Sequence, residues 1–577
     1  MKQKKVKSGQ KLVRRFSHFS RRASEDSIEH IQENLIERIP HARRVRLLIL
    51  EWVLLVAAII FLAITQAFWY SDSYATITYT TGGSYTEATL GKVNSLNPLF
   101  ATTSSEKTLA KLMFATLSAP DYSGHTGLDL AASIRADDSG KVWSIKLRDN
   151  LKWSDGEPIT NEDVLYTIGI IQDANVNTAY TSNLAGVKVS TDGDRIIFTL
   201  PAAYVNFPSA LNIPILPAHI LADVDPELLF EHSFSTNPVT SGAFSYNATQ
   251  SIGTDGEMLV YLTPNTSYFK GAPMLASFAV HAYLTEEDII AALNSGAVTA
   301  TAELLPSHAS HITSPNVYQK QTALASGAYA FINLNSPVLN NQALRRAIQQ
   351  GVDIDALRSN LNGETRLDYP ILSSQIDIGN YPALPEHNPE AAKATIAAAG
   401  ISEDVSIRVV TVSTGRLPTI AEKFTEQLKG LGLNATATIY DPSQDFLMGV
   451  IRPRSYDILI YEVDLGPDPD IFAYYHSSQA SNTGLNLSNY RSALSDELIL
   501  GARSTMDISA RITRYESFLK NWVEDVPAIG IYQTNLAYYL NKNVRSFSED
   551  NRLVYPIDRF ADVARWASEH TTKNRTP

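Results

Sequence analysis

The chain has 577 residues, of which 44% are hydrophobic and 19% charged, and its formal net charge at pH 7 is −12. This length and composition predict a globular protein with roughly two to four lobes or domains, because one core cannot serve so long a chain. The sequence contains no cysteine. This absence excludes disulfides, thiol nucleophiles, Cys-ligated metal sites and a lipid-modified cysteine anchor.

Residues 1–46 form a basic segment, with 13 Lys and Arg against 5 Asp and Glu, a net charge of +8. Subtracting this +8 from −12 leaves −20 for the remainder, and so acidic a remainder is a poor candidate for binding nucleic acid. Apolar residues recur at helical spacing before Pro40 and predict an amphipathic helix: Ile28, Ile31, Leu35, Ile36 and Ile39. Such a helix lies on the anionic inner leaflet of a membrane or, alternatively, docks onto a partner protein.

The run from Trp52 to Tyr70 has no charged residue and has aromatic residues at both ends. Together with the apolar residues before it, this run predicts one transmembrane anchor over residues 47–70. Because basic segments stay inside, the amino terminus is expected in the cytoplasm and the large remainder outside the cell membrane. A cleaved signal peptide is the alternative, but its basic region should be short and a small-residue cleavage site should follow.

Strand and helix patterns alternate after the anchor. Residues 76–83 and 141–147 are expected to be strands, and residues 105–117 are expected to form a helix. Thr103 followed by Glu106 predicts a capping box at the start of this helix.

Four carboxylates crowd the stretch WSDGEPITNEDV, residues 153–164: Asp155, Glu157, Glu162 and Asp163. Paired carboxylates serve acid–base catalysis and metal binding, but local backbone physics also accounts for them here. The Asp-Gly pair is a turn signal, and Thr160 with Asp163 predicts a capping box that starts an amphipathic helix. We therefore interpret this stretch as a structural corner.

The candidate catalytic motifs in the sequence are incomplete. Ser104 and Lys107 have the Ser-x-x-Lys spacing of serine acylases, but the companion motifs are missing. His308 and His311 lie in a loop-like stretch with no third metal ligand near in sequence. We therefore expect no enzyme activity, no metal site and no cofactor, and a secreted hydrolase is disfavoured because no nucleophile and base can be paired.

The clearest α/β unit comprises a strand at 406–413, a helix at 418–432 and strands at 434–441 and 456–464. This order predicts a lobe built on a parallel sheet. Ligands of open α/β sheets bind beyond the carboxyl ends of strands, which indicates the loop after Asp464.

The stretch YEVDLGPDPDIFAYYHSSQ, residues 461–479, combines acidic and aromatic side chains in and after that loop. Its acids do not have the spacing of an EF-hand calcium site, and a solvated loop is the simpler alternative. The aromatic residues around the turn favour a ligand site, because polar groups that converge beside aromatic walls are typical of binding sites.

With these stretches in view, the sequence resembles the bacterial family 5 extracytoplasmic solute-binding proteins, the peptide and nickel group that serves ABC importers. The resemblance runs from about residue 80 to about residue 560 and rests on landmarks in family order: NSLNPLF, LDLAASIRADDSGKVWSIKLRDNLKWSDGEPITNEDVLYTI, LPAHIL, NPVTSGAF, LNNQALRRAIQQGVDIDAL, NPEAAKATIAAAGI, YDILIYEVDLGPDPDIFAYYHSSQ and VPAIGIYQTNLAYYL. It implies an α/β, two-lobed, type II periplasmic-binding-protein-like fold with an extra domain, here preceded by one transmembrane helix.

The resemblance also implies a division of residues 75–570. Lobe I comprises residues 75–115, 237–316 and 526–565, lobe II residues 116–236, and lobe III residues 317–525. In such a protein the lobes close like a hinge on an extended ligand.

The function implied is capture of peptides and their delivery to an ABC permease with its ATPase subunits, by a monomer anchored in the lipid bilayer. The implied ligand-binding residues are Asn97, Tyr461, Glu462, Asp464, Asp468, Tyr475, His476, Tyr532 and Gln533. Asp464 or Asp468 would hold the amino terminus of the peptide, and Tyr475 and His476 would line the wall.

The sequence departs from the family pattern at the anchor and at Glu462, where Trp is common. Two alternatives therefore stay open. The same fold could serve as a sensor or chaperone without a permease, or it could bind another solute such as a nickel chelate, haem or a sugar.

Overall fold

The computed structural model describes residues 46–121, 123–359, 365–400, 406–548 and 550–574, and it describes no side chains for residues 46–49, 67–78 and 569–574. The predicted amphipathic helix before Pro40 lies outside these residues. Contacts divide the chain into two units, one of which is Tyr79–His570 and the other Met1–Thr78 with Thr571–Pro577.

Helix α3, Arg46–Tyr74, is the one long helix of the smaller unit in the described part of the chain. Apolar side chains are exposed along it, from Leu50 to Ile64. None of the described helices has an apolar run long enough to cross a membrane. The predicted anchor over residues 47–70 is therefore helical but is not supported as a membrane span.

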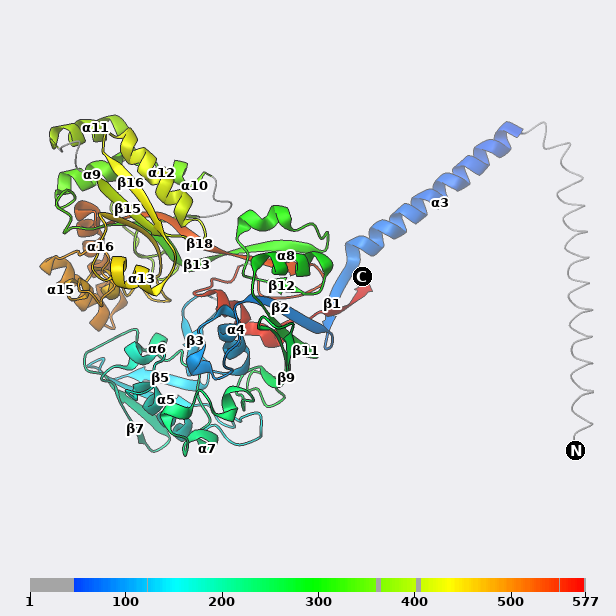
Figure 1. Ribbon diagram of the computed structural model, residues 1–577. Coiled ribbons are helices and arrows are strands. Elements are labelled where there is room, and N and C mark those ends of the chain that lie inside the picture. The colour runs from blue at the N-terminus through cyan, green and yellow to red at the C-terminus, as the bar shows by residue number, and fades with distance from the viewer. Residues whose placement is uncertain (1–45, 122, 360–364, 401–405, 549, 575–577) are drawn as a thin grey trace, which may run out of the picture. The chain divides into compact units, whose positions relative to one another are not determined.

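The larger unit is a mixed α/β structure, as predicted (Figure 1). Its main sheet has eleven strands, in the order β16 (Ala435–Tyr440), β15 (Ile407–Val412), β17 (Ile458–Asp464), β13 (Val317–Ile332), β18 (Ala528–Asn541), β12 (Ala300–Thr301), β2 (Ser84–Leu90), β11 (Ser277–Tyr283), β10 (Glu257–Pro264) and β9 (Phe244–Ile252), with β14 (Thr365–Arg366) paired to β18. β15 pairs in parallel with β16 and β17, which confirms the predicted parallel unit.

Smaller sheets complete the strand content. A four-stranded sheet has the order β5 (Ala131–Ala136), β6 (Val142–Leu147), β8 (Arg195–Thr199) and β7 (Lys188–Asp192). Two-stranded sheets pair β3 (Ser118–Pro120) with β4 (Thr126–Leu128) and β1 (Ala75–Thr80) with β19 (Glu569–Asn574).

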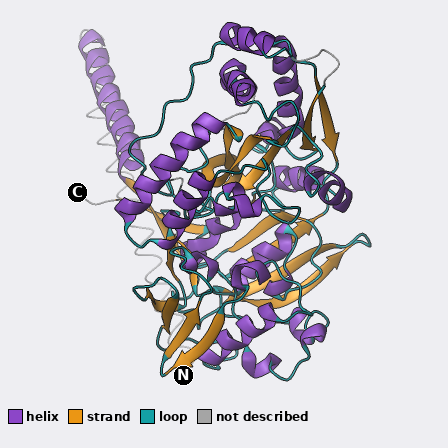
Figure 2. Ribbon diagram, turned by 90° about the vertical axis from the view of Figure 1, so that its left-hand side faces the viewer, coloured by secondary structure: helices purple, strands orange, loops and turns teal. Residues whose placement is uncertain are grey.

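Helices pack around these sheets (Figure 2). The α-helices of the larger unit are α4 (Ser104–Met113), α5 (Asn161–Gln172), α6 (Phe207–Ala210), α7 (Ala218–Leu221), α8 (Glu286–Ser295), α9 (Gln342–Gly351), α10 (Ile354–Arg358), α11 (Pro389–Ala398), α12 (Leu417–Gly430), α13 (Gln444–Phe446), α14 (Phe472–Tyr475), α15 (Ala493–Ser504) and α16 (Ile508–Asp525). Short 3-10 segments are η2 (Pro98–Phe100), η3 (Thr181–Leu184), η4 (Pro226–Leu228), η5 (Ser233–Ser235), η6 (Pro306–His311), η8 (Ser477–Gln479) and η9 (Pro556–Arg565), and η7 (Leu447–Ile451) is a π-helix.

Two large hydrophobic cores lie in this unit. The first core includes Trp153 and Phe278 and is shared by the four-stranded sheet and the β2 end of the main sheet. The second core includes Phe424 and Trp522 and lies around β15, β17 and the helices packed on them. A smaller cluster under α8 includes Ile289 and Leu293.

Strands β13 and β18 connect the two cores. Figure 1 shows both strands running between the group of helices that includes α9 and α12 and the region of α8 and β12. Their antiparallel register is interrupted between Ala323 and Gly327. Because a continuous hydrogen-bonded ladder resists bending, the strands can bend more easily at this interruption. Because Tyr79–His570 form one compact unit, the boundaries of the three lobes stay a prediction.

The stretch WSDGEPITNEDV is a structural corner, as predicted. Gly156 has φ of +99°, a conformation that side chains disfavour, and the chain turns there. At the start of α5, Thr160 donates its N–H to the Asp163 carboxylate at 2.8 Å, and the Thr160 hydroxyl accepts the N–H of Glu162 at 3.2 Å. The capping box of Thr103 and Glu106 at α4 is present as well.

Candidate functional site

Three strands bring part of the predicted site together. β13 lies between β17 and β18, and its Ala328 is opposite Glu462 on one side and Tyr532 on the other. Residues in one such row point to the same face of a sheet, and the small Ala328 leaves the two longer side chains room to meet above it.

Glu462 is the polar centre of this row. Its carboxylate accepts a hydrogen bond from the Thr534 hydroxyl at 2.7 Å and one from the Tyr532 hydroxyl at 3.4 Å. Burial raises the pKa of Glu462, and the nearby positive charge of Arg416 acts in the opposite direction. Gln533 lies beside this group but directs its amide to the carbonyl of Leu324 at 2.8 Å.

Asp464 ends β17, and its side chain is exposed. Its carbonyl oxygen accepts the hydroxyl of Tyr474, whereas its carboxylate has no hydrogen bond or ion pair within the described chain. The surrounding protein disfavours its charge and raises its pKa, although the positive charge of Lys107 on α4 opposes this shift. Asp464 is thus an acidic group with capacity for another cation.

Asp468 is already paired. Its carboxylate lies 2.7 Å from a guanidinium nitrogen of Arg511 on α16, and both side chains are largely buried. Burial disfavours the charge of Arg511, but the hydrogen bond to Asp468 outweighs it and raises the pKa of Arg511. This ion pair leaves Asp468 little capacity for a ligand.

The loop after β17 is held in place by one buried amide. The Gln375 side chain donates to the carbonyl oxygens of Leu465 at 2.9 Å, Gly466 at 2.9 Å and Asp468 at 3.1 Å. One side chain thus ties three carbonyls of this loop together, and Gln375 thereby orders the loop that follows the exposed acid.

One edge of β17 is open beside Asp464. β15 pairs with β17 only at Ile458 and Leu459, so the parallel ladder stops there. From Tyr461 to Asp464, no strand of the described chain pairs with this edge, while β13 covers the other edge. An open strand edge can pair with an extended segment of another chain.

Two other predicted site residues, Asn97 and Tyr475, lie outside this group. Asn97 is buried and caps η2, accepting the N–H of Leu99 at 3.2 Å. Tyr475 is 2% exposed and packs its ring against Phe518 and Trp522, so it belongs to the second core and not to a wall. An aromatic side chain in an apolar run packs inward more readily than it faces a ligand.

His476 and Tyr461 have local partners. His476 stacks on Phe472 with ring centres 4.4 Å apart and bonds the Ser478 hydroxyl at 2.8 Å. Tyr461 is partly buried, and its ring centre is 6.4 Å from that of Phe446.

Sequence reasoning missed Arg416, Arg511, Thr534 and Gln375. Arg511 had a detectable signal, because it shares the apolar face of α16 with Tyr515, Phe518 and Trp522. A charged residue on such a face indicates a buried ion pair. The partners of the others depend on contacts between segments that are distant in the chain, and such contacts leave no local pattern.

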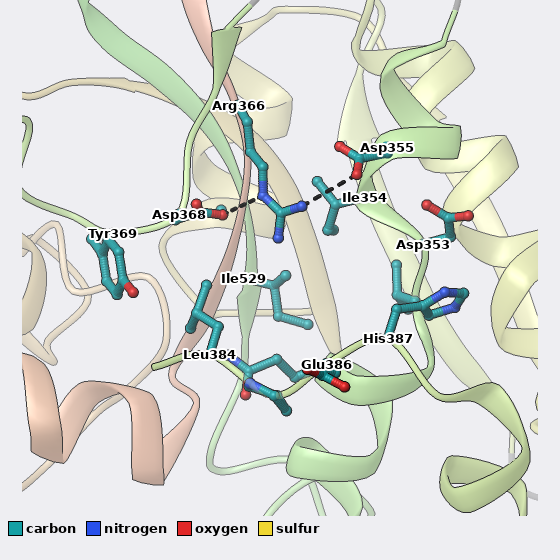
Figure 3. Close-up of a pocket in the computed structure, with 14 residues that line it drawn as sticks. Asp353, Ile354, Asp355, Arg366, Asp368, Tyr369, Leu384, Glu386, His387 and Ile529 are labelled. Carbon is teal, nitrogen blue, oxygen red and sulfur yellow. Dashed lines mark hydrogen bonds and ion pairs between the residues drawn. The ribbon is translucent and has the colours of Figure 1, made fainter. Parts of the chain in front are cut away.

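A separate pocket of about 410 Å³ lies on the second core, lined by α10, β14, residues 384–387 and Ile529–Gly530 of β18 (Figure 3). None of the predicted site residues lines it. Arg366 is paired there with Asp355 at 3.4 Å and Asp368 at 2.5 Å. Arg366 is thus neutralised by two of the four acidic side chains that line the pocket. The described residues include no cluster of three or more His, Asp or Glu able to hold a metal ion.

Comparisons with known proteins agree with this architecture. A family model described as bacterial extracellular solute-binding proteins, family 5 Middle, matches residues 127–484. The oligopeptide-binding protein AppA of Bacillus subtilis is 25% identical over 506 residues, which cover 83% of this chain and 91% of AppA.

Solved structures share the fold. The structure of Bacillus subtilis AppA in complex with a nonapeptide has a TM-score of 0.67 and 23% identity, covering 85% of this chain and 99% of that one. NikZ from Campylobacter jejuni in complex with Ni(L-His) has a TM-score of 0.68 and 21% identity, covering 84% and 99%.

Proposed function

The chain belongs to the bacterial extracellular solute-binding proteins of family 5, and we propose that it captures peptides and delivers them to the permease of an ABC importer. The observation that carries this proposal is the unpaired carboxylate of Asp464 beside an open strand edge. The similarity to AppA, whose structure contains a nonapeptide, supports a peptide as the ligand class. The protein acts by binding and not as an enzyme.

The peptide binds in extended form along β17. Its backbone pairs with the open edge from Tyr461 to Asp464, which gives affinity that depends little on side chains. Its amino terminus meets the carboxylate of Asp464, because Asp468 is already paired with Arg511. Of the two acids that the sequence left open, the ion pair of Asp468 therefore favours Asp464 as the ligand acid.

The neighbouring polar groups set the orientation of the ligand. Glu462 lies two residues before Asp464 on β17 and therefore on the same side of the sheet, and Arg416 lies near Glu462. Lys107 approaches from α4, which packs on the first core. A ligand at Asp464 therefore lies between side chains of the two cores. This is the position expected of a peptide that is enclosed when lobes I and III close like a hinge.

The anchor and the partners complete the proposal. α3 holds the protein in the cell membrane with its amino terminus in the cytoplasm, and a monomer presents the bound peptide to the permease and its ATPase subunits. The support for the anchor is the uncharged run from Trp52 to Tyr70 and the exposed apolar side chains of α3.

Calorimetric titration of the full-length protein with di- to pentapeptides, free and N-acetylated, tests the ligand assignment. Acetylation removes the positive charge and should weaken binding tenfold or more, which corresponds to about 1.4 kcal/mol per decade. Asp464→Asn should abolish the difference between the two forms of the peptide. Asp138→Asn is a matched control, because Asp138 is exposed and lies in the turn between β5 and β6, which contributes no residue to the proposed site.

Equal binding of free and acetylated peptides would contradict the role of Asp464. Binding of a metal chelate, haem or a sugar in place of any peptide would contradict the ligand class while leaving the family assignment intact. An intact protein that associates with no permease would favour the sensor or chaperone alternative.

A further inference from the structure

One arginine lies where the two cores meet. Arg503 is at the end of α15, which packs with α16 on the second core, whereas Tyr204 follows β8 and packs on the first core. The guanidinium carbon of Arg503 is 4.4 Å from the ring centre of Tyr204 and 4.3 Å from that of Phe472. The guanidinium is thus in contact with one ring from each side of the boundary.

A backbone contact fixes the same two segments. The N–H of Val205 donates to the carbonyl oxygen of Arg503 at 2.9 Å. The side chain and the main chain of Arg503 therefore both bind residues that follow β8. The stacking of the guanidinium on the Tyr204 ring and the hydrogen bond from Val205 together define a single docked position for the two segments.

The contact also reaches the loop that follows Asp464. The Nε atom of Arg503 lies 3.2 Å from a carboxylate oxygen of Asp470, two residues after Asp468. Asp468 is held in turn by Arg511, and Gln375 binds the carbonyls of the same loop. The docked segment after β8 therefore rests on the rigid loop next to the proposed ligand acid.

We propose that Arg503 is a closure clamp: Tyr204 and Val205 dock on it when the two cores approach, and the clamp slows the release of the ligand. This inference rests on the proposed binding of a ligand between the cores. The groups that make the clamp all belong to the protein, so the clamp does not need the ligand in order to form. A closed population therefore exists in the ligand-free protein, and the ligand enlarges it.

The absence of cysteine allows a direct test, since two introduced cysteines can be labelled without competition. Thr191→Cys on β7 and Ala394→Cys on α11 are exposed positions on the first and second cores. Spin labels on the full-length protein report the distance between them by double electron–electron resonance. The ligand-free protein should show a shorter and a longer distance, and Tyr204→Leu should reduce the shorter population at least fivefold.

Phe472→Leu is the matched control. It removes a ring from the same guanidinium but leaves the contact across the boundary, so the two populations should change less than twofold. Arg503→Lys keeps the charge but loses the flat stacking surface, and it should behave like Tyr204→Leu. With peptide present, Tyr204→Leu should speed dissociation about tenfold in stopped-flow displacement and leave the association rate within twofold.

Three results would overturn the clamp: no shorter distance in the ligand-free protein, equal effects of Tyr204→Leu and Phe472→Leu, or an unchanged population in Arg503→Lys. Circular dichroism spectra and unfolding midpoints of the variants identify any that fail to fold. The distance measurement needs no peptide. A protein that shows the clamp but binds no peptide would refute the proposed function alone.

Discussion

Replacing Asp468 by Asn should destabilise the second core, whereas the same change at Asp464 should not. The Asp468 carboxylate is 2.7 Å from Arg511, and the two side chains are 18% and 8% exposed. Removing one partner of a buried ion pair leaves the other charge uncompensated and typically costs about 3–5 kcal/mol. We expect a loss of about 3 kcal/mol for Asp468→Asn, since Arg511 keeps its bond to the carbonyl of Ala502 at 3.1 Å.

Urea denaturation followed by tryptophan fluorescence measures this loss. Trp522 of α16 is fully buried in the second core and reports its unfolding. Asp464→Asn should not lower the unfolding midpoint, because the Asp464 carboxylate has no partner within the described chain and its surroundings disfavour its charge. An Asp468→Asn protein with wild-type stability that no longer distinguished free from acetylated peptides would refute the reasoning and exchange the roles of the two acids.

A double-mutant cycle separates the ion pair from local effects. Arg511→Met removes the charge and keeps an apolar side chain of similar length. If the uncompensated charge is the cause, Asp468→Asn combined with Arg511→Met should be less destabilised than the sum of the single changes. If the losses of unfolding free energy in the two single variants simply add in the double variant, the uncompensated charge is not the cause of the destabilisation.

Three further predictions concern other parts of the chain. Thr160→Ala should lower the unfolding free energy by about 0.5–2 kcal/mol through loss of a cap, with peptide affinity unchanged in calorimetry. Burial raises the pKa of Glu462, so the folded state binds its proton more tightly and stability should fall as pH rises from about 4.3 through the raised pKa. The urea unfolding midpoint should depend less on pH across this window in Glu462→Gln than in the wild type. The same pH dependence in both proteins would contradict a raised pKa of Glu462. The full-length protein should stay in membranes after salt and carbonate washes, and a mature protein that begins near Ser71 would contradict the anchor.

Local rules predicted the features whose causes are close together in the sequence. Both capping boxes need only residues three positions apart, Thr103 with Glu106 and Thr160 with Asp163, and both are present. The parallel unit around β15 was readable because each strand and helix carries its own periodicity. The corner at Gly156 depends on the backbone freedom of one residue.

The sequence could not distinguish the two candidate ligand acids. Asp464 and Asp468 are alike in type and lie four residues apart in one acidic loop. They differ because α16 brings Arg511 to Asp468 and because β15 stops pairing with β17 before Asp464. Both causes are long-range contacts, which no local pattern of residues records.

The sequence also could not distinguish the aromatic residues that follow this loop. Tyr474 and Tyr475 are adjacent, yet one bonds the carbonyl of Asp464 and the other is enclosed by Phe518 and Trp522. The sequence by itself determined the types of elements and their order, since these depend on neighbouring residues. Only the tertiary structure decided which side chains are paired, buried or available to a ligand, because packing joins segments that are far apart in the chain.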